Sequence, residues 1–210
     1  MSPNDRGAPG KPAAQASFSL SATDPLTMLD SRRSVPFLQL QAPGPDDATL
    51  RRLLRSAVRV PDHGKRVPFR FVTLRGDARR EFGERLASRH REVDPDAGEA
   101  VIDKDRDRYL HAPLIVVAIA RLGPDAKIPE QERLLSAGCT CFALLQGAQA
   151  LGFRGCWLTG WAAYDREVAR MLGLEADERV IGFIHLGTAK IEVPERDRPE
   201  PDALLSEWTP

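Results

Sequence analysis

Hydrophobic residues along this chain recur with two periods, which predict a mixture of helices and strands. Helical spacing begins after Asp24-Pro25, a helix-capping residue followed by proline, and again after the Pro43-Gly44-Pro45 break. Further helices are predicted over residues 77–86, 98–109 and 165–172, the second of them facing solvent. The longest helical stretch, 129–151, is apolar nearly all round in its second half, so we expect it to be buried.

Four short segments have the pattern of β-strands. Residues 68–74 alternate between apolar and polar, which is typical of a strand with one buried face. Residues 113–120 are continuously apolar and β-branched, which fits a strand covered on both faces. Two more strands are predicted at 155–158 and 179–186. The order of elements favours a three-layer α+β domain over a regular series of βαβ units.

The two ends of the chain differ from its middle. Residues 1–22 contain Pro, Gly, Ala, Ser and Gln without a sustained apolar stretch, so we interpret them as a disordered leader, neither a signal peptide nor a membrane span. Residues 23–190 form the predicted domain. Residues 191–210 are charged and proline-rich but carry an apolar tip, Leu204, Leu205 and Trp208. We expect this tail to pack on the domain or on a partner subunit.

Composition excludes several classes of partner. The chain has 210 residues, of which 42% are hydrophobic and 29% charged, enough for one well-packed domain. Lys+Arg and Asp+Glu both number 30, so no overall basic field would attract nucleic acid or an anionic membrane. The three cysteines lack the spacing of a zinc site, and we expect no metal. Their odd number favours reduced, mostly buried thiols and a cytoplasmic protein.

Two short clusters concentrate hydrogen-bond donors in predicted loops. They are Arg32-Arg33-Ser34 and, one helix later, the segment from Arg59 to Lys65, which contains His63. Guanidinium groups bind phosphate oxygens two at a time, and a hydroxyl can complete the oxygen shell. The clusters therefore predict a site for a phosphorylated ligand, although a solvated basic face explains either cluster alone equally well.

The sequence lacks the motifs of a dinucleotide-binding loop and of a catalytic nucleophile. Residues 152–155 lack both the G-x-G-x-x-G spacing and the following helix of a dinucleotide loop. Ser34, Ser136 and Cys139 do not lie in a nucleophile elbow with a recognisable base. A Rossmann site, a P-loop or a protein nucleophile is therefore not expected.

Four strings follow one another in order over residues 24–190. They are R-R-S after the first helix, R-V-P-D-H-G-K-R-V-P-F-R-F-V after the second, E-R-L-L-S-A-G-C in the long helix, and G-F-R-G-C-W-L-T-G. Together they resemble the flavin-dependent nitroreductase family, in particular its minimal YdjA-type branch. The resemblance implies a nitroreductase-like three-layer α+β fold with a mainly antiparallel central sheet, and a homodimer with two FMN sites at the subunit interface.

The resemblance also assigns residues to these sites. Arg32, Arg33 and Ser34 would hold the phosphate and ribityl end of FMN, with Arg59 and His63 also reaching the flavin. From the sequence alone, His63 could instead cap the preceding helix.

Two further stretches match the family. Trp157, Leu158 and Thr159 would approach FMN from the other subunit, although an aromatic residue on a buried strand is usually part of the core. The end of the long helix corresponds to a stretch sometimes assigned to NADH or NADPH, although a helix C-terminus is a poor phosphate site. Its residues are Gly147, Ala148, Gln149, Ala150, Leu151 and Gly152.

Two departures from the family pattern affect specificity more than cofactor binding. The chain has Phe69 where the branch often has Trp, and Leu158 where it often has Arg. The expected function is an FMN-dependent oxidoreductase that takes hydride from NADH or NADPH and reduces nitroaromatics, quinones or other unsaturated small molecules by a ping-pong mechanism. The alternatives are a protein that sequesters FMN or senses redox state without turnover, and a different reaction on this scaffold, such as reductive dehalogenation or flavin fragmentation.

Overall fold

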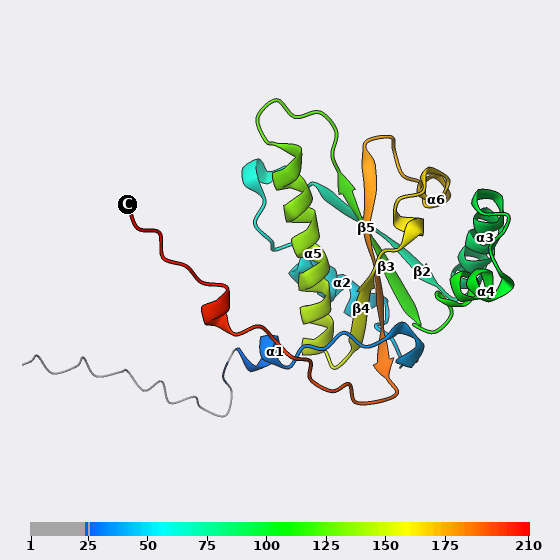
Figure 1. Cartoon of the computed structure of the whole chain (residues 1–210), viewed down its shortest axis with the longest axis horizontal. Coiled ribbons are helices and arrows are strands. Elements are labelled where there is room, and N and C mark those ends of the chain that lie inside the picture. Colours follow the sequence, from blue (N-terminus) through cyan, green and yellow to red (C-terminus); the bar gives the residue numbers. More distant parts are fainter. Residues whose placement is uncertain (1–23, 25) are drawn as a thin grey trace, which may run out of the picture.

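The computed structural model describes residue 24 and residues 26–210, so the predicted leader at 1–22 lies outside the described residues. Figure 1 shows a central sheet between two groups of helices. The strands are β1 (Leu40–Gln41), β2 (Phe69–Arg75), β3 (Leu114–Arg121), β4 (Arg154–Leu158) and β5 (Glu178–Ala189). The α-helices are α1 (Thr27–Asp30), α2 (Asp47–Ala57), α3 (Asp77–Val93), α4 (Glu99–Asp107), α5 (Glu130–Ala150) and α6 (Arg166–Met171). Short 3₁₀ turns are η1 (Phe37–Gln39), η2 (His63–Lys65), η3 (Trp161–Ala163) and η4 (Pro201–Ala203).

The sheet is antiparallel throughout its named strands, as the resemblance implied. Its order is β1-β5-β3-β2, with β4 also paired to β5. Strand β5 is therefore the centre of the sheet, because it pairs with three of the other strands. One further bridge, parallel, joins Ser34 to Gly155 and lays the segment after α1 alongside the start of β4.

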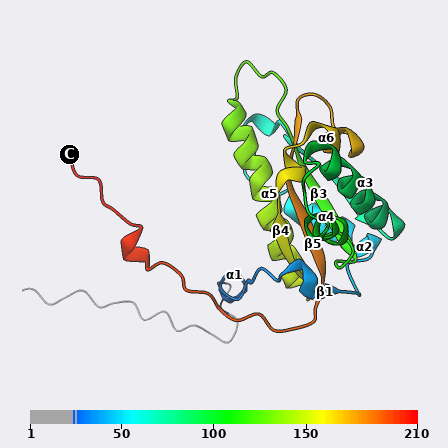
Figure 2. The same ribbon diagram turned by 45° about the vertical axis from the view of Figure 1, so that its right-hand side comes forward.

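Two hydrophobic cores lie on opposite faces of the sheet, and alternate residues of β3 supply both. Ile115, Val117 and Ile119 pack towards α3 and α6, whereas the side chains between them pack towards α2 and α5. The turned view in Figure 2 shows the same three layers, with α5 on one side of the sheet and α3 on the other. The predicted three-layer α+β architecture is confirmed.

Helix α5 departs from its predicted burial. Its inner face is buried in the core beneath it, but Leu135, Cys139 and Phe142 are exposed. These residues are spaced i, i+4 and i+7, so they form one apolar stripe along the helix. A stripe of this kind is typical of a surface that meets another apolar surface. Among the described residues, no helix is long and apolar enough to cross a membrane.

The first and last described segments meet beside the C-terminal end of α5. Gln149 Nε2 donates hydrogen bonds to the Met28 carbonyl at 2.8 Å and to Ser31 Oγ at 2.9 Å, which ties α1 to α5. The C-terminal segment passes α1 and then leaves the domain, as both views show. Its apolar tip is exposed, with Trp208 83% accessible.

Candidate functional site

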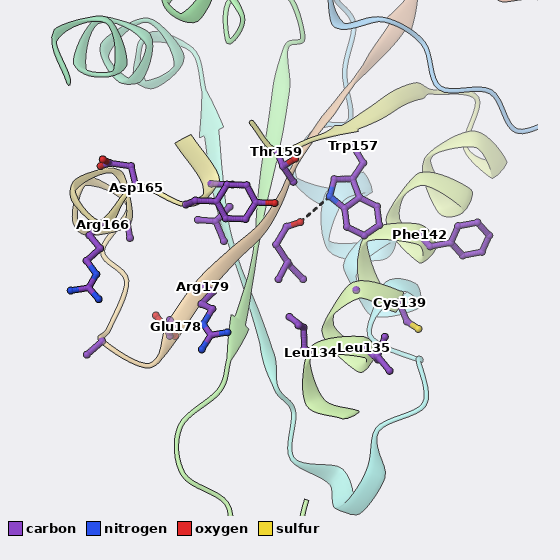
Figure 3. Close-up of a pocket in the computed structure, with 17 residues that line it drawn as sticks. Leu134, Leu135, Cys139, Phe142, Trp157, Thr159, Asp165, Arg166, Glu178 and Arg179 are labelled. Carbon is purple, nitrogen blue, oxygen red and sulfur yellow. Dashed lines mark hydrogen bonds between the residues drawn. The ribbon is translucent and has the colours of Figure 1, made fainter. Parts of the chain in front are cut away.

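An open groove of about 1000 Å³ lies between α5 and the segment that leads into α6. Strands β4 and β5 form its floor, and Figure 3 shows α5 side chains on one side and α6 residues on the other. Its apolar lining includes Leu134, Leu135, Phe142, Trp157 and Tyr164. A concave site with apolar walls and a few polar groups is the usual form of a small-molecule site.

Trp157 is fixed on the floor of the groove. Its indole Nε1 donates a 2.9 Å hydrogen bond to the carbonyl of Ile181, drawn as a dashed line in Figure 3. That carbonyl is free because a β-bulge leaves Ile181 without a partner on β3. The indole lies against Gly182, where a Cβ atom would come within 2.1 Å of the indole nitrogen. Only glycine at 182 lets the ring adopt this position.

The acidic residues of the groove are already engaged. Arg70 donates two hydrogen bonds to Glu178, of 2.7 and 2.6 Å, and these lower the pKa of the Glu178 carboxyl to about 2 although its burial acts the other way. Burial likewise opposes ionisation of Asp165, but hydrogen bonds from Arg89 and from the backbone bring its pKa below the ordinary value. Both carboxylates are therefore held in the charged form, in ion pairs with Arg70 and Arg89.

Four arginines converge where the two terminal segments meet. Arg32 and Arg33 come from the segment after α1, and Arg196 and Arg198 come from the segment after β5. Burial and the charges of the other three arginines lower the pKa of Arg32. Glu195 pairs with Arg33 and, at 3.1 Å, with Arg198. Among the described residues, no carboxylate lies within ion-pair distance of Arg32, so the cluster keeps an excess of positive charge.

Arg196 and Arg198 could not be identified from the sequence, because they lie in a segment interpreted only as a charged tail. Their place beside Arg32 depends on β5, which returns the chain to the start of β4, where Ser34 also lies. Arg32 Nη1 donates a 3.3 Å hydrogen bond to Ser34 Oγ, so this hydroxyl belongs to the same cationic cluster. Unneutralised guanidinium groups next to a hydroxyl are suited to bind a phosphate.

The cationic cluster and the groove lie along one strand. Ser34 bridges Gly155, and Val35 N–H donates a 3.1 Å hydrogen bond to the Gly155 carbonyl. Thr159 follows Gly155 by four residues, which corresponds to roughly 13 Å of extended chain. The structure therefore brings Arg32, Arg33 and Ser34 together with residues 157–159 in a single subunit, where the resemblance had placed 157–159 on the other one.

The side chains within 157–159 face different ways. Trp157 and Thr159 line the groove, whereas Leu158 packs against the core on the opposite face of the sheet. Phe69, the other departure from the family pattern, is buried against Ala120 and Leu122. Neither departure places its side chain in the groove.

Arg59 and His63 lie at the far end of α5. His63 Nδ1 pairs with Glu132 at 2.7 Å, and Ser136 Oγ donates to the Pro61 carbonyl at 2.7 Å, so this loop follows the first turns of the helix. Gln149, next to α1, is 17 residues further along α5 than Glu132. That separation corresponds to roughly 25 Å along the helix axis. One chain therefore does not bring Arg59 and His63 to the cationic cluster.

The stretch Gly147–Gly152 has structural contacts instead of a place in the groove. Gly147 packs against Leu53, Gln149 holds α1, and Gly152 ends the helix with a φ of +84°. None of the six residues lines the groove. The exposed carbonyls of a helix C-terminus also repel phosphate, so the geometry gives no support to a nicotinamide nucleotide site here.

Two of the three cysteines have the expected buried role. Burial raises the pKa of Cys141 and of Cys156 to about 12, which leaves both thiols protonated and unreactive. Cys139 is exposed on the α5 stripe and lines the groove.

Comparison with known proteins gives a consistent result. Residues 29–188 match the family model described as "Nitroreductase family". The Escherichia coli K12 protein named "Putative NAD(P)H nitroreductase YdjA" is 31% identical over 169 residues, which cover 80% of this chain and 90% of that protein. A nitroreductase-like family protein from Bacillus cereus has the same fold, with a TM-score of 0.74, 19% identity and coverage of 89% and 97% of the two chains. A Desulfovibrio desulfuricans protein described as a "putative nitroreductase in complex with fmn" has the same fold, with a TM-score of 0.68, 21% identity and coverage of 88% of this chain and 97% of that one.

Proposed function

Because this chain belongs to the nitroreductase family, we propose that it is an FMN-dependent oxidoreductase that uses NADH or NADPH to reduce nitroaromatic, quinone or other unsaturated small molecules. The observation that carries the proposal is the arrangement of two features along β4. A partly buried cationic cluster lies at one end and an apolar groove with an aromatic floor at the other, roughly 13 Å apart. This layout matches a ligand with an anionic tail and a flat ring.

The chain's own residues fit the two ends of FMN. Arg32, Ser34 and Arg198 would bind the phosphate through charge-assisted hydrogen bonds, and the groove beyond would receive the ring system. When bound, FMN supplies two-electron chemistry: it accepts a hydride from NADH or NADPH and returns two electrons to the acceptor. Trp157 and Thr159 would orient the flat ligands and exclude water from them. The groove needs no acidic or basic side chain for this chemistry, in keeping with the engaged state of Glu178 and Asp165.

We assign the hydride donor, NADH or NADPH, and the acceptor to the same groove, where they bind one after the other. Residues Gly147–Gly152 have no part in binding either ligand in this proposal. Because one open face serves both ligands, the order of events is ping-pong. The expected result is a family of parallel double-reciprocal plots when NADPH is varied at several acceptor concentrations.

A second copy of the chain completes the site in this proposal. Arg59 and His63 follow the first turns of α5, and His63 lies roughly 25 Å along that helix from the cationic cluster, too far to reach the phosphate end of a flavin bound in the same subunit. In a two-fold dimer whose α5 helices pack antiparallel through the exposed stripe, the far end of one helix comes next to the near end of its partner. Arg59 and His63 would then reach the flavin bound on the other chain.

The C-terminal tail fits the same arrangement. After passing α1, the C-terminal segment leaves the domain, and Leu204, Leu205 and Trp208 are all exposed. Exposed apolar side chains at the end of an extended segment gain stability only where they can be buried. We assign them to the surface of the partner subunit.

Replacement of Phe142 by Asp is expected to convert the dimer into monomers and to weaken FMN retention. The phenyl ring is 49% exposed on α5, and a carboxylate in its place would be desolvated in the proposed interface. Analytical ultracentrifugation and the flavin absorbance per chain after gel filtration measure the two effects. Val101→Asp is the matched control, because Val101 is 48% exposed on α4, away from the stripe. If Phe142→Asp remains a dimer, the interface lies elsewhere.

The whole proposal is tested by adding FMN to the purified chain. We expect a yellow protein that oxidises NADH or NADPH in the presence of a nitroaromatic acceptor. A protein that binds FMN but never turns over supports the alternative, a flavin-sequestering or redox-sensing role. A protein that stays colourless and monomeric with excess FMN contradicts both.

A further inference from the structure

The segment that closes the groove opposite α5 has little structure of its own. It runs from Thr159 through η3 to Arg166, and Thr159, Tyr164 and Arg166 all line the groove. Gly160 has a φ of +72°, a left-handed conformation that makes a sharp turn directly after Thr159. Its internal hydrogen bonds are those of a single turn, such as Tyr164 N–H to the Trp161 carbonyl at 2.9 Å. The conformation of this wall must therefore be fixed from outside the segment.

Asp105 of α4 provides that contact. Asp105 is 5% exposed, and its Oδ2 accepts two short hydrogen bonds, from Trp161 Nε1 at 2.6 Å and from His90 Nδ1 at 2.5 Å. The imidazole of His90 also packs edge-on against the Trp161 indole, with ring centres 5.1 Å apart. A buried carboxylate is stable only while its donors are in place, so Asp105 and Trp161 hold each other in one arrangement.

A second contact reaches the turn itself. Arg108 Nη2 lies 3.6 Å from Asp105 Oδ1, and a Cβ atom on Gly160 would come within 3.0 Å of Arg108 Nη1. The guanidinium therefore lies directly behind the Gly160 turn. At the other end of the segment, Arg89 of α3 donates to Asp165, with Nη2 3.0 Å from Oδ2. The layer of α3 and α4 thus holds the groove wall at both ends.

We propose that Asp105 is a positioning residue for the flavin site: through Trp161 and Arg108 it sets the Gly160 turn, and with it Thr159, in the conformation that receives the ring. This inference rests on the proposed function for the identity of the ligand. Asp105 itself lies behind the wall and does not line the groove, so its effect is carried by the segment 159–166.

The test uses two substitutions and their combination. Trp161→Phe keeps an aromatic ring but removes the N–H donor, and Asp105→Asn keeps the shape but removes the charge. Loss of a hydrogen bond to a charged group corresponds to about tenfold or more in an equilibrium. We expect hydrogen exchange of backbone amides in 159–164 to be about tenfold faster in each FMN-free variant, and FMN to dissociate about tenfold more readily. The double variant should differ little from Asp105→Asn alone, because Asp105→Asn already weakens the contact that Trp161→Phe removes.

Arg91→Gln is the matched control. Arg91 pairs with Glu99 at 3.0 Å and so also joins α3 to α4, but it does not contact the segment 159–166. The rate of amide hydrogen exchange in 159–164 and the FMN affinity of the Arg91→Gln variant should equal those of the unmodified chain. If Trp161→Phe does not fold, Asp105→Asn gives the same measurement. Variants that lose thermal stability but keep normal exchange in 159–164 and normal FMN affinity would overturn the inference. Should the unmodified chain bind no FMN, the proposed function fails, and the exchange measurement alone still decides on Asp105.

Discussion

Replacing Arg32 and Ser34 together by alanine is expected to weaken FMN binding by at least about a hundredfold. Both side chains lie in the cationic cluster, and the pKa of Arg32 is lowered by burial and by the charges of Arg198, Arg33 and Arg196. A phosphate relieves that repulsion and accepts a charge-assisted hydrogen bond from each group, with each bond contributing about 1.5–3 kcal/mol. Quenching of flavin fluorescence during titration gives the dissociation constant.

Riboflavin makes the experiment specific for the phosphate. It has the same ring and ribityl chain as FMN but no phosphate, so the unmodified chain should prefer FMN and the Arg32→Ala, Ser34→Ala variant should bind both about equally weakly. Arg198→Ala should lose part of the same preference. Arg51→Ala is the control, because Arg51 is exposed on α2 and outside the cluster. Full retention of FMN by the double variant would remove both residues from the phosphate site.

His185→Leu is expected to reduce the loss of stability that the folded chain suffers between pH 6.5 and about 3. His185 is completely buried on β5, and among the described residues neither ring nitrogen has a hydrogen-bond partner. Burial, followed by the charges of Arg108 and His111, lowers the pKa of His185 to about 3. The unfolded chain takes up a proton near pH 6.5, whereas the folded chain excludes it, so acid favours unfolding across this window.

The size of this effect follows from the shift in pKa. One pKa unit corresponds to about 1.4 kcal/mol, so the fall in the free energy of unfolding from pH 6.5 to pH 3 should be up to about 5 kcal/mol smaller in His185→Leu than in the unmodified chain, with no effect of His185 on the pH dependence above pH 7. Urea unfolding at several pH values, on protein without flavin, measures it. His63→Gln is the control, because the His63 side chain is 65% exposed. An unchanged acid dependence in His185→Leu would mean that the folded chain accommodates the charged imidazole.

The sequence predicted the elements well where burial alone decides the structure. The apolar run at 113–120 predicted a strand covered on both faces, and residues 114–120 are all completely buried in β3. Helix α4 was expected to face solvent, yet Ile102 and Asp105 are buried. The local sequence does not distinguish a buried charged residue such as Asp105 from a solvent-exposed one. The partners that bury Asp105, Trp161 and His90, come from other parts of the chain.

The candidate site shows the same limit. The family resemblance selected Arg32, Arg33 and Ser34 from local strings, and these residues do lie together. It could not indicate Arg196 and Arg198, since their position depends on how β5 returns the chain to α1. Nor could the resemblance indicate that residues 157–159 and Ser34 lie along the same strand. Their proximity follows from a single backbone bridge between Ser34 and Gly155.

The contact between Trp157 and Gly182 restricts how this chain can diverge. Any side chain at position 182 would collide with the indole, because its Cβ atom would lie 2.1 Å from the indole nitrogen. A larger residue at position 182 is therefore compatible with the fold only after Trp157 has been replaced by a smaller residue. Among related chains we therefore expect covariation of these two positions, with tryptophan at 157 found alongside glycine at 182.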